Sequence, residues 1–174
     1  IEAILKKDTR MAFITAAMGG GTGTGAAPVI ARLSKDMGIL TVGIVSVPAR
    51  FEGPKRLDQA RDGLPRLKDH VDCLIVIDNE KIKSIYGSQT ISQAFAKAND
   101  VLNIAAKGIA EIITLPGYIN VDFADVRTVM TDSGVAIMGA AQASGEDRAI
   151  RAITEAVESP LLNNNDILGA KDIL

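Results

Sequence analysis

The sequence predicts an α/β fold: a doubly wound parallel sheet, a long central helix, and the start of a second α/β domain behind that helix. Three apolar runs of strand length, at residues 11–18, 39–47 and 73–77, alternate with stretches of helical periodicity. The runs are continuously apolar, which is typical of parallel strands buried on both faces. Because strands that alternate with helices pair in parallel, this order favours a sheet with helices on both sides.

Two helices are expected between these three strands. The first covers 26–36, with Pro28 near its start, where a helix tolerates the missing N–H. The second covers 54–71, where leucine, alanine and valine recur at helical spacing. Pro65 lies inside this second pattern, and since proline removes a backbone donor we expect it to kink or break the helix.

A longer helix is expected at 91–115. One apolar stripe runs from Ile91 to Ile112, which corresponds to a helix of roughly 37 Å, and a Pro-Gly stop follows it. Behind it we expect a short helix near 124–130, an apolar run at 135–143, a helix at 146–158 and a polar loop at 163–166. The chain therefore divides into a first domain at 1–90, a connecting helix at 91–115 and the beginning of a second domain at 116–174.

Composition argues against several classes of protein. The formal charge is −2, with acidic and basic residues interspersed, so neither nucleic acid nor a membrane surface is indicated as a partner. No apolar stretch reaches about 18 residues and no basic leader is present, so we expect a cytoplasmic protein without direct membrane insertion. Cys73 and His70 have no second Cys or His nearby; we interpret Cys73 as a core residue and expect no metal bound by these side chains.

The strongest signal is a glycine run directly after the first apolar stretch. Residues 19–25 hold five glycines and two threonines, and a helical pattern follows. A strand that ends in glycines and enters a helix presents unpaired N–H groups to an anion at the positive end of the helix dipole. Glycine allows a phosphate to approach the backbone closely, and threonine hydroxyls can add hydrogen bonds. The run therefore predicts a phosphate site.

Two readings of this phosphate site stay open at the level of motifs. The P-loop pattern fails because no Lys-Ser or Lys-Thr pair follows the glycines. Gly21, Gly23 and Ala26 fit the dinucleotide fingerprint G-x-G-x-x-A, but the end of the next strand lacks the acidic residue that would hold a ribose. Arg50 lies there instead and suits a 2′-phosphate, so an NADP-linked oxidoreductase is one alternative.

A second candidate site lies in NVDFADV, residues 120–126. Asp122 and Asp125 are three residues apart, so at a helix start both carboxylates lie on one face, and Asn120 precedes them. Spacing alone favours a capping role, in which these side chains satisfy free N–H groups at the positive end of the helix. Capping and catalysis are compatible in one pair of carboxylates.

Several segments together resemble the bacterial FtsZ branch of the tubulin/FtsZ GTPase family, whose members act in cell division. The segments are GGGTGTGAAP at 19–28, GILTVGIVS at 38–46, FEG at 51–53, NDVL at 99–102, NVDFADVRTVM at 120–130, ASGEDRA at 143–149 and SPLL at 159–162. They cover essentially the whole chain in family order, and NVDFADVRTVM is the segment most specific to this branch.

The resemblance implies a GTP site with three groups of residues. The phosphates would be held by Gly19, Gly20, Gly21, Thr22, Gly23 and Thr24, the ribose side would meet Glu52 and Arg56, and the guanine would face Phe95, Asn99 and Asp100. A carboxylate on the base would reject adenine, which lacks guanine's pair of donors. For Phe95 the alternative is a plain core position, since it lies on the apolar stripe.

The resemblance also implies how hydrolysis is achieved. Asn120, Asp122 and Asp125 would act on the nucleotide of the neighbouring subunit, so that GTPase activity depends on head-to-tail assembly into the filaments of a cytoplasmic division ring. Magnesium is the expected companion of GTP, with no protein ligand assignable in this chain. The three parts of the chain would then be the rest of a GTP-binding domain, the central helix and a truncated C-terminal activation domain.

Family members also contain segments that these 174 residues do not include. They are an earlier nucleotide loop, a C-terminal sheet and a tail that meets adaptor and regulator proteins. We therefore expect weak or no GTP binding and weak or no activity from this chain alone. A further alternative is that the chain is a non-catalytic module that caps filaments.

Overall fold

The computed structural model describes residues 1–81, 90–116, 120–157 and 170–174. Its centre is one parallel sheet in the order β1-β2-β3-β4. The strands are β1 Met11–Ala17, β2 Leu40–Val47, β3 Cys73–Asp78 and β4 Gly134–Val135. The predicted parallel α/β sheet is confirmed, and its first three strands lie within a residue or so of their expected positions.

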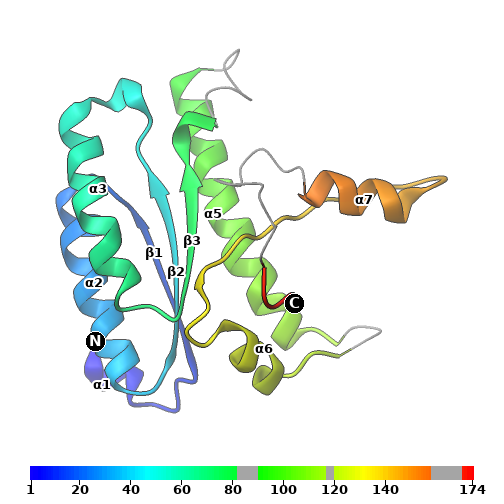
Figure 1. The fold of residues 1–174 in the computed structure, drawn as a ribbon, viewed down its shortest axis with the longest axis horizontal. Coiled ribbons are helices and arrows are strands. Elements are labelled where there is room, and N and C mark those ends of the chain that lie inside the picture. The colour runs from blue at the N-terminus through cyan, green and yellow to red at the C-terminus, as the bar shows by residue number, and fades with distance from the viewer. Residues whose placement is uncertain (82–89, 117–119, 158–169) are drawn as a thin grey trace.

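Helices cover both faces of the sheet (Figure 1). The helices of the described residues are α1 Glu2–Leu5, α2 Gly21–Asp36, α3 Pro54–Lys68, α5 Ile91–Thr114, α6 Phe123–Met130 and α7 Arg148–Val157, with a short 3-10 turn η1 Arg50–Glu52. Helices α2 and α3 lie on one face, and α5 crosses the other, antiparallel to the strands. The long helix expected at 91–115 is thus confirmed.

Two details of the helices differ from expectation. Helix α2 begins at Gly21, five residues before the predicted start at residue 26, because the glycine run itself forms the first turn. Pro65 does not break α3, which continues to Lys68. Since Pro65 lies in the last turn, it removes only the hydrogen bond to the carbonyl of Arg61, and the turn beyond it is complete.

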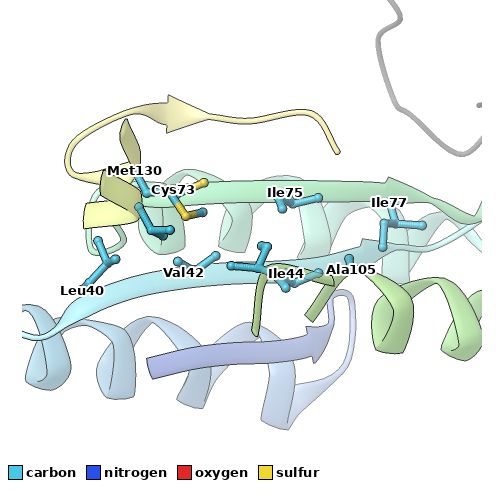
Figure 2. Close-up of a cluster of buried hydrophobic side chains, with 10 residues drawn as sticks. Leu40, Val42, Ile44, Cys73, Ile75, Ile77, Ala105 and Met130 are labelled. Carbon is cyan, nitrogen blue, oxygen red and sulfur yellow. The ribbon is translucent and has the colours of Figure 1, made fainter. Parts of the chain in front are cut away.

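The sheet separates two apolar cores. On one face Val45 and Leu74 pack against alanines of α2 and α3 and against Leu67. On the other face the core residues are Leu40, Val42, Ile44, Cys73, Ile75 and Ile77 of β2 and β3, Ala105 and Ile109 of α5, and Val126 and Met130 of α6 (Figure 2). Burial raises the pKa of the Cys73 thiol, which is fully buried, so its interpretation as a core residue is confirmed.

A buried carboxylate joins four elements at the edge where the strands begin. Asp72 has a side chain only 8% exposed; its Oδ2 accepts from the Thr41 N–H at 2.8 Å, and its Oδ1 lies 3.2 Å from Lys35 Nζ. Its carbonyl accepts from the Gly134 N–H at 3.0 Å. Asp72 therefore links α2, β2, β3 and β4 at one point.

The C-terminal part of the chain contributes little to the sheet. In the apolar run expected at 135–143, only Val135 is in a strand. This strand, β4, pairs with β3 and so belongs to the same sheet as β1–β3. Helix α7 projects from the body of the molecule with Ile150 and Ile153 exposed (Figure 1). The polar loop at 163–166 lies outside the described residues, and the division into domains stays a prediction. No helix within the described ranges is long and apolar enough to cross a membrane.

Asp72→Ala is expected to lower the free energy of unfolding by about 2–3 kcal/mol, because it leaves a buried N–H of Thr41 unpaired and removes one partner of Lys35. Urea unfolding of the complete chain measures this. Asp58→Ala is the control, because its pair with Arg61 is exposed, with side chains 69% and 79% accessible, and we expect a change of less than about 0.5 kcal/mol. Equal losses in the two variants would contradict the linking role of Asp72.

The contribution of Lys35 is expected to depend on pH. Hydrogen bonds from Lys35 to Asp132 and Asp72 raise its pKa above the ordinary value. A raised pKa in the folded state means that the stabilisation is complete below the unfolded value of about 10.4 and is lost as pH rises through the folded value. On the alkaline side of neutrality, the difference in unfolding free energy between wild type and Lys35→Met should therefore begin to shrink only above about pH 10.4. A difference that shrinks between neutral pH and 9 would contradict this.

Candidate nucleotide site

The glycine run forms a short, tightly closed turn between β1 and α2. Only Met18, Gly19 and Gly20 separate the two elements, and Gly19 has φ of 92°, a conformation that favours glycine. The Gly19 N–H donates to Thr24 Oγ1 at 2.9 Å, and the Thr24 N–H donates to the Gly20 carbonyl at 3.3 Å. Thr24 is 8% exposed, so its side chain lies inside the turn and closes it.

The glycines of this turn serve two different purposes. A Cβ on Gly23 would lie 2.1 Å from the Ala17 carbonyl oxygen, and one on Gly19 would lie 2.6 Å from the Arg56 carbonyl oxygen. Gly23 therefore allows α2 to approach β1 closely, and Gly19 allows the turn to approach α3 closely. A Cβ on Gly20 or Gly21 would meet nothing within 4 Å, and both residues are exposed.

Open space at Gly20 and Gly21 lies directly at the N-terminus of α2. Gly20 is the N-cap residue, and no side chain caps this end within the part of the chain that the structure describes. The N–H groups of a first helical turn lack partners within the helix, and together with the dipole they bind anions. A phosphate therefore fits beside Gly20, Gly21 and the exposed Thr22, where it would meet free backbone N–H groups, open space and the positive end of the helix dipole.

Glu52 is held rigidly at the same edge of the sheet. Its side chain is 9% exposed, and Oε2 accepts from the Arg56 guanidinium at 3.0 Å. Oε1 accepts from the Ala49 N–H at 2.9 Å and from Asn79 Nδ2 at 3.4 Å. Because Ala49 follows β2 and Asn79 follows β3, these bonds tie together the loops at the carboxyl ends of two strands.

An aromatic pair brings the start of α5 to this edge. The rings of Phe51 and Phe95 meet edge to face, with centroids 6.2 Å apart and planes at 62°. Phe51 is 51% exposed and Phe95 is 37% exposed, so Phe95 is a surface position rather than a core residue. Asn99 and Asp100 are exposed one turn further along α5. The ring contact thus places Phe95, one of the predicted base-facing residues, beside the loop that carries Glu52.

The acidic loop, residues 120–126, begins with a capping box. Asp122 is the N-cap of α6, and its Oδ1 accepts from the N–H groups of Ala124 at 2.7 Å and Asp125 at 2.9 Å. Asp125 Oδ2 accepts from the Asp122 N–H at 3.2 Å. The capping role that spacing favoured is therefore confirmed, while Asn120, Asp122 and Asp125 all stay exposed.

The acidic loop and the glycine turn lie at opposite edges of the sheet (Figure 1). Helix α6 packs where the strands begin: the Arg10 guanidinium lies 4.1 Å from the Phe123 ring centroid, and Arg127 donates to the Gly38 carbonyl at 3.3 Å. The glycine turn follows the other end of β1, a strand of seven residues that spans about 23 Å. One chain therefore does not bring the two predicted groups together.

A family model matches the half of the chain that contains the glycine turn. Residues 1–87 match the tubulin/FtsZ family, GTPase domain. The chain belongs to the tubulin/FtsZ family. Residues 134–174 match the FtsZ family, C-terminal domain. The family assignment agrees with the resemblance expected from the motifs, and it favours the GTPase interpretation of the glycine run over the dinucleotide one.

Individual relatives support the same family over nearly the whole chain. The chain is 52% identical to the cell division protein FtsZ of Porphyromonas gingivalis over 95% of its own length and 36% of that protein. It is 53% identical to that of Coxiella burnetii over 95% of the chain and 43% of that protein. A solved FtsZ dimer of M. jannaschii superimposes with a TM-score of 0.87 at 48% identity, covering 92% of this chain and 47% of that one. This member of the family thus spans less than half the length of the relatives it matches.

Two residues of the site were not predicted from the sequence. Phe51 and Asn79 contact Phe95 and Glu52, respectively. Both follow the carboxyl ends of parallel strands, where ligands of such sheets bind, and that position is the signal that could have identified them. Within the described ranges, no group of three or more His, Cys, Asp or Glu side chains could hold a metal ion.

Gly21→Val is expected to lower nucleotide affinity without lowering stability, whereas Gly23→Ala is expected to lower the stability of the fold. The valine enters open space, so stability is retained while nucleotide affinity falls roughly tenfold or more. The alanine meets a backbone oxygen, so unfolding free energy falls by about 1–3 kcal/mol. Calorimetric GTP titration measures the loss of affinity and urea unfolding measures the loss of stability, both on the complete protein that contains these 174 residues. Normal affinity in Gly21→Val would contradict a phosphate at this turn.

Proposed function

We propose that the complete protein binds GTP and hydrolyses it in a site shared by two subunits. The observation that carries the proposal is the placement of the glycine turn and the acidic loop at opposite edges of one sheet. Two subunits stacked head to tail along the strands would bring the acidic loop of one to the glycine turn of the next. Such a heterologous contact repeats without closing, which produces filaments.

On the nucleotide side, each group has a role suited to its surroundings. The N–H groups at Gly20 and Gly21, with Thr22, bind phosphate oxygens, while Thr24, Gly19 and Gly23 shape the turn. Glu52 and Arg56 meet the ribose, with Glu52 held by the donors described above. Phe95 covers the base, and Asn99 and Asp100 recognise guanine, because a carboxylate accepts from the guanine N1–H and amino group. A polar site of this kind strongly rejects bases that lack those donors.

On the acidic side, the carboxylates orient and polarise the attacking water. Phosphoryl transfer depends chiefly on positioning and charge stabilisation, and Asp122 and Asp125 are already immobilised by the capping box. Asn120 lies beside them as an additional polar group. Magnesium, held by the nucleotide rather than by side chains of this chain, would neutralise phosphate charge.

The cellular role follows from the family. The relatives are named cell division protein FtsZ, and one solved structure is named an FtsZ dimer. We infer that the complete protein assembles with copies of itself in the cytoplasm at the division site. Adaptor and regulator proteins would bind through segments other than these 174 residues, and the chain alone would have weak or no activity.

Asp122→Asn separates capping from catalysis. Asparagine caps helices as well as aspartate, so unfolding free energy should change by less than about 0.5 kcal/mol. Loss of the charge should lower the kcat for GTP by roughly a hundredfold, measured as phosphate release from the complete chain. Asp122→Ala should lower stability by about 1 kcal/mol as well. Unchanged turnover in both variants would contradict the catalytic role of the acidic loop.

A site shared between subunits also predicts a concentration dependence. Turnover per subunit should rise steeply with protein concentration, because an isolated subunit lacks half of the site. Light scattering on the same samples reports assembly. Turnover per subunit that stays constant down to concentrations without assembly would show that one subunit suffices, and the proposal would fail.

A further inference from the structure

We propose that Lys35 is a positioning residue for hydrolysis, which acts by holding α6 so that the acidic loop meets the neighbouring subunit in the correct orientation. This inference rests on the proposed function. Lys35 lies in the last turn of α2, almost a hundred residues before the segment it contacts. It touches neither the glycine turn nor the acidic loop directly.

Lys35 makes three polar contacts at the edge of the sheet where the strands begin. Its Nζ lies 2.8 Å from Asp132 Oδ1, 3.2 Å from Asp72 Oδ1 and 3.3 Å from the Val71 carbonyl oxygen. Asp72 is buried and joined to β2, so it anchors the ammonium to the sheet. Asp132 is 74% exposed and lies two residues after the end of α6. The lysine thus bridges a rigid element and the end of a short helix.

Helix α6 is short enough for a contact at one end to orient the other. Its eight residues span about 12 Å. Val126 and Met130 anchor its apolar side in the core, and Arg10 lies over the Phe123 ring near its start. Lys35 contacts Asp132, in the segment just beyond the C-terminus of α6. Without Lys35 the C-terminal end of α6 loses one of its contacts while the Arg127–Gly38 hydrogen bond remains, so we expect α6 to shift about its apolar side and to displace Asp122 and Asp125.

The segment after α6 has a backbone that needs this support. Asp132 has φ of 51°, which is uncommon for a residue other than glycine. The contact with Lys35 helps to hold Asp132 in this conformation, from which the chain enters β4. Asp132→Gly removes the carboxylate and adopts the same φ without strain, so it breaks only the link to Lys35.

Lys35→Met in the complete chain is expected to lower kcat for GTP between roughly tenfold and a hundredfold, with KM changed by less than about twofold. Lys35→Arg should restore most of the turnover. Arg32→Met is the matched control on the same helix, because Arg32 pairs only weakly with the exposed Asp36, at 3.9 Å; we expect wild-type turnover. If Lys35→Met does not fold, Asp132→Gly replaces it. Unchanged kcat in the folded variant would overturn the proposal.

Complementation between variants decides which side of the site Lys35 serves. Gly21→Val loses the nucleotide side and keeps an acidic loop, whereas Asp122→Asn does the reverse. Turnover of Lys35→Met should therefore recover in equimolar mixtures with Gly21→Val and should not recover with Asp122→Asn. This readout is independent of a general loss of stability, which neither partner would rescue.

The other outcomes are distinguishable. Rescue by Asp122→Asn instead of Gly21→Val would show that Lys35 acts through α2 on the glycine turn. Rescue by neither variant would show a general folding defect. Either outcome would overturn the role proposed for Lys35 and would leave the proposed shared site standing. If Gly21→Val and Asp122→Asn fail to rescue each other, the shared site itself is wrong, and the inference about Lys35 fails with it.

Discussion

The parallel order of the strands is the constraint on which the rest of the molecule depends. Because all four strands point the same way, every loop that leaves a strand lies at one edge and every loop that enters a strand lies at the other. The glycine turn, Glu52 and Asn79 all leave strands and therefore gather at the carboxyl edge. Helix α5 starts beside them and, over 24 residues or roughly 36 Å, carries the chain back to the other edge. The acidic loop follows the end of α5. The direction of the backbone alone therefore places the glycine turn and the acidic loop at opposite edges of the sheet.

The regular elements were predictable because their signals are local. Continuous apolar runs, an apolar stripe of helical period and a glycine run each act over a few residues, and the strands and α5 lie close to where these patterns place them. What depends on contacts between distant segments was not predictable. The spacing of the glycines does not reveal that Gly23 faces the Ala17 carbonyl while Gly21 faces open space. Likewise, nothing near Phe51 in the sequence indicates its contact with Phe95, and nothing near Lys35 indicates Asp132.

Asp122 and Asp125 have a capping role in the structure, and its geometry leaves room for the catalytic role that we propose for them. The capping box uses one oxygen of each carboxylate on backbone N–H groups, and both side chains stay exposed. The hydrogen bonds that stabilise the start of α6 also restrict the rotation of the carboxylates. A group immobilised for stability is already oriented for a reaction, so the entropy of orienting it is lost in folding and not at the moment of catalysis.

Helix α2 runs from one edge of the sheet to the other and carries a residue of interest at each end. It begins at Gly21 in the glycine turn and ends at Asp36, next to the lysine that contacts Asp72 and Asp132. Its 16 residues form a rod of about 24 Å, packed along one face of the sheet through Ala27 and Ala31. Small alanine side chains and the absent side chain of Gly23 bring the helix close to the strands, where close packing leaves little freedom for independent movement. One closely packed helix therefore carries both Gly21 of the glycine turn and the lysine that contacts the segment after α6, so the sheet fixes the positions of both.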